Sequence, residues 1–158
     1  MLVAVGDSIV EIVRKLQTSL RELSYRVLKS DHSSIMERIQ LVLTKADTAD
    51  QASVDSAIEM VATHGFINPI VLSSHTGTGI EELRTTMLHS LFGPQRNVII
   101  HPGRQGEPAI EALLSRLFDT VYVHDHQREN NVIEVRISAS DETLAILQAT
   151  YGERIELK

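Results

Sequence analysis

The sequence predicts an α/β protein in which a parallel sheet is followed by a small α+β domain. Over residues 1–92, short apolar runs alternate three times with amphipathic stretches, an order typical of a parallel sheet with helical crossovers. Residues 93–96, Gly-Pro-Gln-Arg, interrupt this alternation, as is expected at a domain boundary. Beyond them, the apolar pattern indicates the order β-α-β-β-α-β. We therefore predict two domains, residues 1–93 and residues 97–158.

The first domain is expected to begin with a strand from Leu2 to Val5 and a helix from Ile9 to about residue 28. Ser8-Ile-Val-Glu is a capping box for this helix, because the hydroxyl accepts a free backbone N–H and the glutamate reaches back. Aliphatic residues then recur at steps of three and four, which indicates an amphipathic helix. The polar residues 29–34 end the pattern and predict a loop.

Two further strand–helix pairs complete the expected parallel sheet. A strand over residues 39–43 precedes a helix that is capped by Ser53 and ends near Gly65. A strand over residues 70–72 precedes a helix over residues 80–92, whose apolar residues again recur at helical spacing. The first domain is thus expected to contain three parallel strands, each followed by a helix.

The second domain is expected to contain a hairpin with one solvated face, because apolar and polar residues alternate on both sides of the polar residues 125–131. The other expected elements are a strand over residues 98–100, a helix led by Pro108, hairpin strands over 120–124 and 132–137, a helix capped by Ser140 and ended by Gly152, and a closing strand over 155–157. The order β-α-β-β-α-β is the ferredoxin-like pattern.

Polar residues follow two neighbouring strands of the predicted sheet. Residues 44–47 are Thr-Lys-Ala-Asp, and residues 73–75 are Ser-Ser-His. Because parallel strands end at one edge of the sheet, we expect these residues to lie together. An ionised Asp47 offers two acceptor oxygens to adjacent N–H groups of guanine, a pairing that adenine cannot make. The aliphatic stem of Lys45 would lie against the ring face.

These two segments resemble the guanine-recognition motifs of translational GTPases. Residues 44–47 are similar to the specificity tetrad Asn-Lys-x-Asp, and residues 73–75 are similar to the Ser-Ala-Lys loop one strand later. The spacing, the glycines that follow and the terminal domain are most similar to the HflX family of ribosome-associated GTPases. The resemblance covers nearly the whole chain, as the second half of a P-loop GTPase-like domain plus the C-terminal domain. The chain differs from the pattern at Thr44, Ser74 and His75.

The resemblance implies GTP or GDP as the ligand. The residues implied in binding it are Thr44, Lys45, Asp47, Ser73, Ser74 and His75. The Thr44 hydroxyl would tie the two loops together, as the asparagine does in the family. Backbone N–H groups of Ser74 and His75 would donate to the guanine carbonyl oxygen, although His75 lacks the lysine stem that covers the base.

The resemblance also implies work on the large ribosomal subunit, either splitting stalled ribosomes or assisting subunit assembly. Its partners would be the rRNA and proteins of that subunit, in the mitochondrial matrix or the cytoplasm, with the matrix favoured. A net charge of −6 argues against nonspecific nucleic-acid binding. RNA contact by Arg104 is one interpretation of its loop, but a plain solvated connection is preferred. The apolar runs are shorter than the about 20 residues of a membrane helix, so no membrane partner is expected.

The sequence lacks the catalytic motifs of a GTPase. It has no Gly-x-x-x-x-Gly-Lys-Ser/Thr phosphate loop and no Asp-x-x-Gly loop, so we do not expect it to hydrolyse GTP alone, and Mg²⁺ would need the other half of the domain. In the resembled family, the strand from Leu2 to Val5 pairs with the strand that carries the phosphate loop. We therefore expect an N-terminal half of the same protein, or a partner chain, to cover this edge.

The alternative function is a noncatalytic, degenerate relative that keeps the GTPase-like architecture as an assembly or interaction factor and binds no nucleotide. The departures from the guanine motifs favour this alternative. A free-standing enzyme built on the second domain has little support, because that domain presents no convergent nucleophile, base and oxyanion donors.

Two other groups of polar residues have simpler interpretations. His124 and His126 would share one face of a regular strand, and a metal site there is one interpretation. No third ligand is suggested nearby, so the polar end of a hairpin is preferred. Asp7 precedes the capping residue Ser8, and we assign it to the start of the helix rather than to catalysis.

Overall fold

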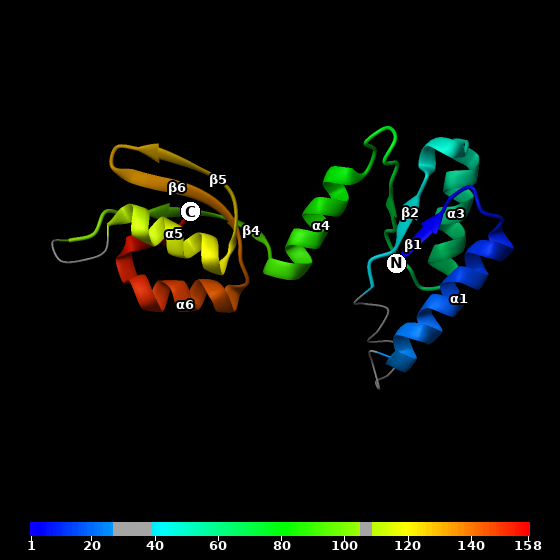
Figure 1. Ribbon diagram of the computed structural model, residues 1–158, viewed down its shortest axis with the longest axis horizontal. Helices are drawn as coiled ribbons and strands as arrows, with labels where there is room; N and C mark the ends of the chain where they lie inside the picture. Colours follow the sequence, from blue (N-terminus) through cyan, green and yellow to red (C-terminus); the bar gives the residue numbers. More distant parts are fainter. Residues whose placement is uncertain (27–38, 105–108) are drawn as a thin grey trace. The chain divides into compact units, whose positions relative to one another are not determined.

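The protein divides into two compact units in the computed structural model. The described residues are 1–26, 39–104 and 109–158, and the units are Met1–Leu83 and Arg84–Lys158. Figure 1 shows that each unit has its own sheet and helices. The first sheet is parallel with three strands and the second is antiparallel with four, so the predicted α/β class is confirmed. The expected loop at 29–34 and the predicted helix start at Pro108 lie outside the described residues.

The first sheet contains β1 (Leu2–Ala4), β2 (Val42–Thr44) and β3 (Ile70–Val71), in that spatial order. All pairs are parallel, with Leu43 beside Val3 on one side and beside Val71 on the other. The expected parallel order is confirmed. β2 begins later and ends one residue further on than the apolar run suggested, so Thr44 belongs to the strand.

Two helices, α1 (Ile9–Arg26) and α3 (Gln51–Thr63), pack against this sheet (Figure 1). The core unites Val3, Val5, Leu41 and Leu43 from the sheet region, Ile12 and Leu16 from α1, and Val54, Ala57 and Val61 from α3. Steps of three and four residues bring these side chains to one face of each helix. Burial of this apolar face holds the carboxyl ends of the strands in place.

The cap of α3 differs from the prediction. Asp50, not Ser53, is the N-cap, and its side chain accepts the Ser53 N–H at 2.9 Å. A carboxylate before the helix accepts an N–H three positions later, so the helix begins at Gln51 rather than after Ser53. The prediction for the other end is confirmed, because Gly65 has a φ of 89° and donates its N–H to the Ala62 carbonyl at 2.9 Å.

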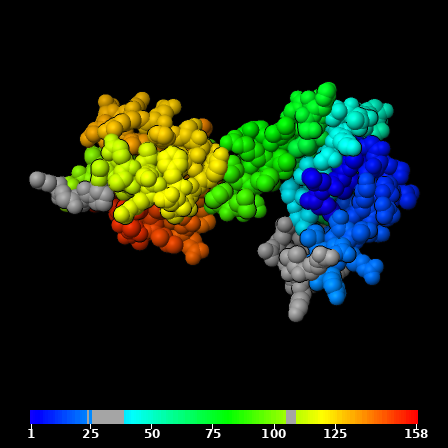
Figure 2. Space-filling view, in the orientation of Figure 1, coloured from blue at the N-terminus to red at the C-terminus, as the bar shows by residue number. Residues whose placement is uncertain are grey.

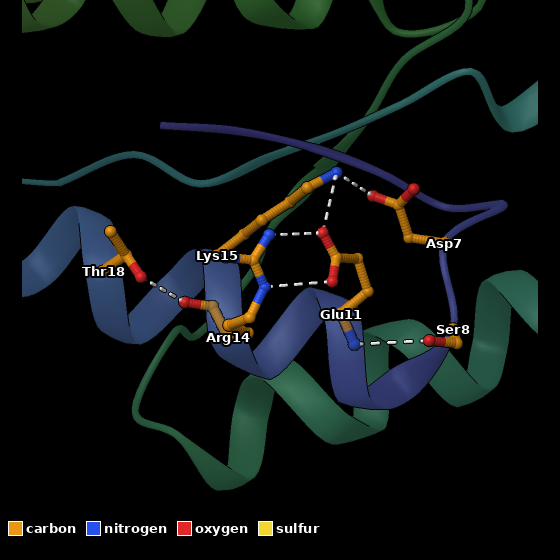
Figure 3. A network of polar contacts seen from close by, with 6 residues as sticks. All are labelled: Asp7, Ser8, Glu11, Arg14, Lys15 and Thr18. Atoms are coloured by element: carbon orange, nitrogen blue, oxygen red, sulfur yellow. Dashed lines mark hydrogen bonds and ion pairs between the residues drawn. The ribbon is translucent and has the colours of Figure 1, made fainter.

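A polar network fixes the turn between β1 and α1 (Figure 3). The Ser8 hydroxyl accepts the Glu11 N–H at 3.3 Å, as the capping box predicted. The Asp7 carboxylate forms an ion pair with the Lys15 ammonium at 2.6 Å. The Glu11 carboxylate accepts two hydrogen bonds from the Arg14 guanidinium, at 2.7 and 3.0 Å. Asp7 is thus held by the helix that follows it.

The outer edge of β1 is open in the part of the chain that the structure describes. There β1 pairs with β2 alone. Leu2 is 70% exposed, and the first residues, in dark blue, lie at the visible surface (Figure 2). An open parallel edge with an exposed leucine is a site where another strand can pair.

The second unit has the chain order β4 (Gln95–Ile100), α5 (Ile110–Thr120), β5 (Tyr122–Glu129), β6 (Val132–Ser138), α6 (Asp141–Tyr151) and β7 (Ile155–Leu157). The spatial order of its antiparallel sheet is β5-β6-β4-β7. Leu113 of α5 and Leu147 of α6 share one core with Val98 and Val135 from the sheet. Both helices therefore cover the same face. Ser140 caps α6 by accepting the Thr143 N–H, and Gly152 ends the helix, as predicted.

The hairpin is longer than the sequence suggested. Residues 125–131 were expected to form a polar loop, but β5 continues to Glu129, and the turn is the pair Asn130 and Asn131, with φ of 45° and 68°. Asparagine accepts such backbone angles in a two-residue hairpin turn. The charged strand is accommodated because Arg128 pairs with Glu111 at 2.8 Å, so polar residues do not mark the end of the strand here.

The two histidines of β5 do not share a face. A register shift lies between Val123 and Asp125, and an extra residue reverses the alternation of a strand. The His124 ring contacts Ser138 at 2.9 Å, whereas the His126 ring packs edge-on against Phe118 of α5. The expectation that both point the same way was wrong. Within the described ranges, no group of three possible metal ligands gathers.

Candidate functional site

The candidate site lies where β2 and β3 end. Because these strands are parallel neighbours, the loops after them meet at one edge of the sheet. Lys45 follows β2, and a single turn of 3-10 helix, Ala46–Thr48, presents Asp47. The Ala46 N–H donates to the Leu72 carbonyl at 3.2 Å. The first polar segment is therefore tied through its backbone to the residue that precedes the second one.

Asp47 and Ser73 form the centre of the site. The Ser73 hydroxyl donates to Asp47 Oδ1 at 2.5 Å, and the Thr76 N–H donates to the Ser73 oxygen at 3.2 Å. Ser73 is only 1% exposed, so its hydroxyl is held firmly. The carboxylate has about four lone-pair positions, and it therefore keeps acceptor capacity toward a ligand after accepting from Ser73.

Asp47 is ionised at neutral pH. The hydrogen bond from Ser73 lowers the pKa of its carboxyl most, and its own backbone N–H and the charges of His75 and Lys45 lower the pKa further. Partial desolvation opposes these effects but does not outweigh them. An exposed, oriented carboxylate of this kind accepts two adjacent N–H donors well.

A pocket of about 380 Å³ opens beside this carboxylate. Its lining comprises Ala46, Asp47, Ala49, Gln51, Val54, Ile58, Val71, Ser73, Thr76 and Thr78. Aliphatic side chains of α3 and β3 supply an apolar wall, while the carboxylate and the threonines supply polar groups. Volume and lining are typical of a site for one small heterocycle.

Lys45 has a left-handed backbone, with φ of 59° and ψ of 38°. Such a conformation is uncommon outside glycine and asparagine, and strained residues of this kind gather at functional sites. The turn is held because the Lys45 carbonyl accepts the N–H of Thr48 at 3.0 Å and its hydroxyl at 2.9 Å. The sequence pattern gave no signal for this backbone.

Thr44 does not join the two loops as expected. Its hydroxyl donates instead to the Val3 carbonyl of β1 at 3.2 Å. Thr44 is the last residue of β2, and a short side chain there reaches the adjacent strand sooner than the next loop. The link expected from Thr44 is made by the Asp47–Ser73 hydrogen bond instead.

Ser74 and His75 are exposed and lie outside the pocket lining. They form a tight turn in which the Ser73 N–H donates to the Thr78 carbonyl at 3.0 Å and the Gly77 N–H donates to the Ser73 carbonyl at 2.9 Å. The structure therefore brings Asp47 and Ser73 together in the pocket but leaves these two neighbours at its outside.

Three polar lining residues were missed in the sequence. Thr76 and Thr78 share a hydrogen bond between their hydroxyls at 2.8 Å, and Gln51 lies in the first turn of α3. Hydroxyls that alternate with the glycines over residues 76–79 were the available signal, since such loops expose polar groups at a strand end. Nothing in the sequence marked Gln51.

Comparisons with known proteins name no family for this chain. No model of a known protein family matches the sequence, and no curated protein matches it. Within the described residues, every helix is too short or too polar to cross a membrane. The functional assignment therefore depends on the geometry of the site and on the motif resemblance.

Proposed function

We propose that this chain supplies guanine recognition to a ribosome-associated GTP-binding protein of HflX type. The main support is the Asp47 carboxylate, which is ionised, fixed by the Ser73 hydroxyl at 2.5 Å and set beside an apolar pocket. Guanine presents two neighbouring N–H donors on one edge, and a carboxylate accepts both at once. Adenine offers no such pair, so the site would select guanine.

The remaining residues of the motifs have lesser roles in this proposal. Lys45 is exposed, and its stem would cover the ring from the solvent side. Thr44 supports the strand beneath, through its hydrogen bond to Val3. Ser74 and His75 would contribute backbone N–H groups at the mouth of the site, and the interaction with His75 also lowers the pKa of Asp47.

The topology is compatible with this function. We assign the first unit to the second half of a P-loop GTPase-like sheet, because it has three parallel strands with the polar motifs at their carboxyl ends. We assign the second unit to the ferredoxin-like class, because the chain order β-α-β-β-α-β combines with the spatial order β5-β6-β4-β7. In the proposal, the second unit is the docking domain.

Hydrolysis is not assigned to this chain. Its sequence contains no phosphate loop, and catalysis and Mg²⁺ binding would belong to an N-terminal half or a partner chain that pairs with β1. The exposed Leu2 at the open edge of β1 supports such a partner. The protein is a GTPase only if that half belongs to the same polypeptide.

The ribosomal role follows from the family resemblance. The proposed partners are the rRNA and proteins of the large subunit, and the proposed work is ribosome splitting or subunit assembly. The mitochondrial matrix is favoured over the cytoplasm as the compartment. The net charge of −6 restricts RNA contact to local surfaces.

The test of guanine recognition is an amide NMR titration of the whole chain with guanosine and with adenosine. We expect guanosine, and not adenosine, to shift the signals of residues 44–48 and 73–78. Asp47→Asn removes the charged acceptor and should weaken guanosine binding about tenfold or more. Asp119→Asn, an exposed change on α5, is the matched control and should leave binding unchanged. Equal shifts with adenosine, or unchanged binding by Asp47→Asn, would overturn the proposal.

The second candidate is a noncatalytic assembly factor that binds no nucleotide. The Thr44 hydroxyl favours it, because it supports β1 rather than the loops, and so does the outward position of Ser74 and His75. In the titration above, this candidate predicts that guanosine causes no shifts at residues 44–48 or 73–78.

A further inference from the structure

The carboxyl edge of the first sheet is rich in acidic groups at the helix starts. Asp7 precedes α1 and Glu11 lies in its first turn. Asp50 is the cap of α3. The third helix, α4 (Ile80–Phe92), follows β3 and carries Glu81 and Glu82 in its first turn. Each described helix that follows a strand of this sheet thus begins beside carboxylates.

At the starts of α3 and α1, side chains already occupy free N–H groups to which a phosphate would bind. The free N–H groups and the positive dipole of a helix N-terminus ordinarily attract phosphate. In α3, the Asp50 carboxylate already accepts the Ser53 N–H at 2.9 Å. In α1, the Ser8 hydroxyl accepts the Glu11 N–H at 3.3 Å. An incoming phosphate would have to displace a bound side chain and approach a like charge.

Two of these acidic groups, Asp50 and Glu11, have a lowered pKa. Hydrogen bonds from the Ser53 side chain and backbone lower the pKa of Asp50. The guanidinium of Arg14 lowers the pKa of Glu11 through a hydrogen bond and its charge. Asp50 and Asp47, whose pKa is lowered by Ser73, give this edge a negative field.

Two cations of α1, Arg14 and Lys15, form ion pairs with carboxylates of the same helix start. The Lys15 ammonium lies 2.6 Å from Asp7 and 4.0 Å from Glu11. The Arg14 guanidinium donates two hydrogen bonds to the Glu11 carboxylate (Figure 3). Lys45 and His75, whose charges lower the pKa of Asp47, are set against the carboxylates of Asp47 and Asp50. The described residues at this edge therefore suit a guanine base better than the phosphates of GTP.

From these contacts we infer that the Asp47 pocket of this chain takes an uncharged guanine or guanosine, and that added phosphate groups weaken binding. This inference rests on the proposed function. It assigns phosphate binding wholly to another segment or partner, which has to bring enough positive charge to offset Asp47 and the carboxylates at the starts of α3 and α4. In this inference, the described chain binds the guanine base, and another segment or a partner chain binds the phosphates.

The expected effect is moderate and depends on salt. Two unit charges about 10 Å apart in water change an affinity about twofold, and several such pairs act together. We expect GTP to bind at least about threefold more weakly than guanosine at about 20 mM salt, where the screening length is long. At about 0.5 M salt the difference should nearly vanish.

The experiment is an amide NMR titration of the whole chain with guanosine, GMP, GDP and GTP, without Mg²⁺, at both salt concentrations. The inference predicts that affinity falls along this series at low salt. Tighter binding of GTP than of guanosine would overturn the inference and leave guanine recognition standing. Absence of binding by every member would overturn guanine recognition itself, and the inference with it.

A charge-neutral variant tests the cause. Asp50→Asn with Glu82→Gln removes two charges, and asparagine remains a good N-cap. We expect GTP affinity to rise about threefold at low salt while guanosine affinity stays unchanged. Glu142→Gln in the first turn of α6 is the matched control and should change neither. Unchanged GTP affinity in the double variant would overturn the electrostatic explanation.

Discussion

At the scale of single residues, the turn between β3 and α4 depends on Gly79. Its φ is +73°, and a Cβ there would lie 2.0 Å from the Val71 carbonyl oxygen. A side chain at this position would both strain the backbone and collide with the strand. We expect Gly79→Ala to lower the free energy of unfolding by about 2 to 4 kcal/mol, as measured by urea denaturation.

Gly77 is the matched control in the same turn. Its φ is +82°, but nothing lies within 4 Å of a Cβ built there. Gly77→Ala should therefore cost only the backbone term, about 1 kcal/mol. If both alanine variants lose the same stability, then the close approach of the Val71 carbonyl is not what restricts position 79.

The acidic residues of the site also determine how stability responds to pH. The pKa values of Asp47 and Asp50 are lowered by hydrogen bonds that exist only in the folded state. A lowered folded-state pKa contributes stability above the unfolded-state pKa, and that stability is lost as pH falls through the folded value. We expect the urea midpoint of the first unit to be flat from pH 7 to 5 and to fall below about pH 4.

The measurement is urea denaturation followed at pH 7, 5, 4 and 3, with Asp50→Asn as the comparison. Asparagine keeps the cap but does not titrate, so its midpoint should fall less between pH 5 and pH 3. A midpoint that rises on acidification would contradict the sign argued here. An identical fall in both proteins would mean that Asp50 contributes nothing to it.

The sequence was informative about which residues meet, and less so about which bonds they form. Asp47 and Ser73 were predicted to lie together because parallel strands deliver their ends to one edge, and they do, at 2.5 Å. The partner predicted for Thr44 was wrong, because its hydroxyl donates to the Val3 carbonyl of the adjacent strand rather than to the next loop. The left-handed backbone of Lys45 depends on the local turn, which residue type alone does not determine.

At the scale of elements, periodicity identified the helices but not what covers them. The start of α6 at Ser140 and its end at Gly152 were readable because capping residues act locally. The apolar stripe of α4 was also readable, but Met87 is 53% and Leu91 71% exposed. Spacing predicts a helix face, whereas burial depends on distant segments. The hairpin was misjudged for the same reason, since Arg128 is matched by Glu111 of another element.

At the scale of the whole molecule, the chain order of both sheets followed from the sequence, but their spatial order did not. The order β5-β6-β4-β7 depends on which apolar faces pack together, and this is a property of the assembled core. The two cores contain different residues, with Leu16 in one and Leu113 in the other. Each core is therefore expected to determine the stability of its own unit.

Substitution within one core tests this separation. Leu113 is fully buried among Val98, Val135 and Leu147, and Leu113→Ala leaves a cavity that should cost the second unit about 2 to 5 kcal/mol. Hydrogen exchange followed by mass spectrometry should then accelerate in β4 and β6 and stay unchanged in α1 and α3. Because changes in separate cores add independently, Leu16→Ala, the reciprocal control, should accelerate exchange in α1, α3 and the first sheet and leave β6 protected. Equal acceleration of both units by Leu113→Ala would mean that the two cores unfold as one.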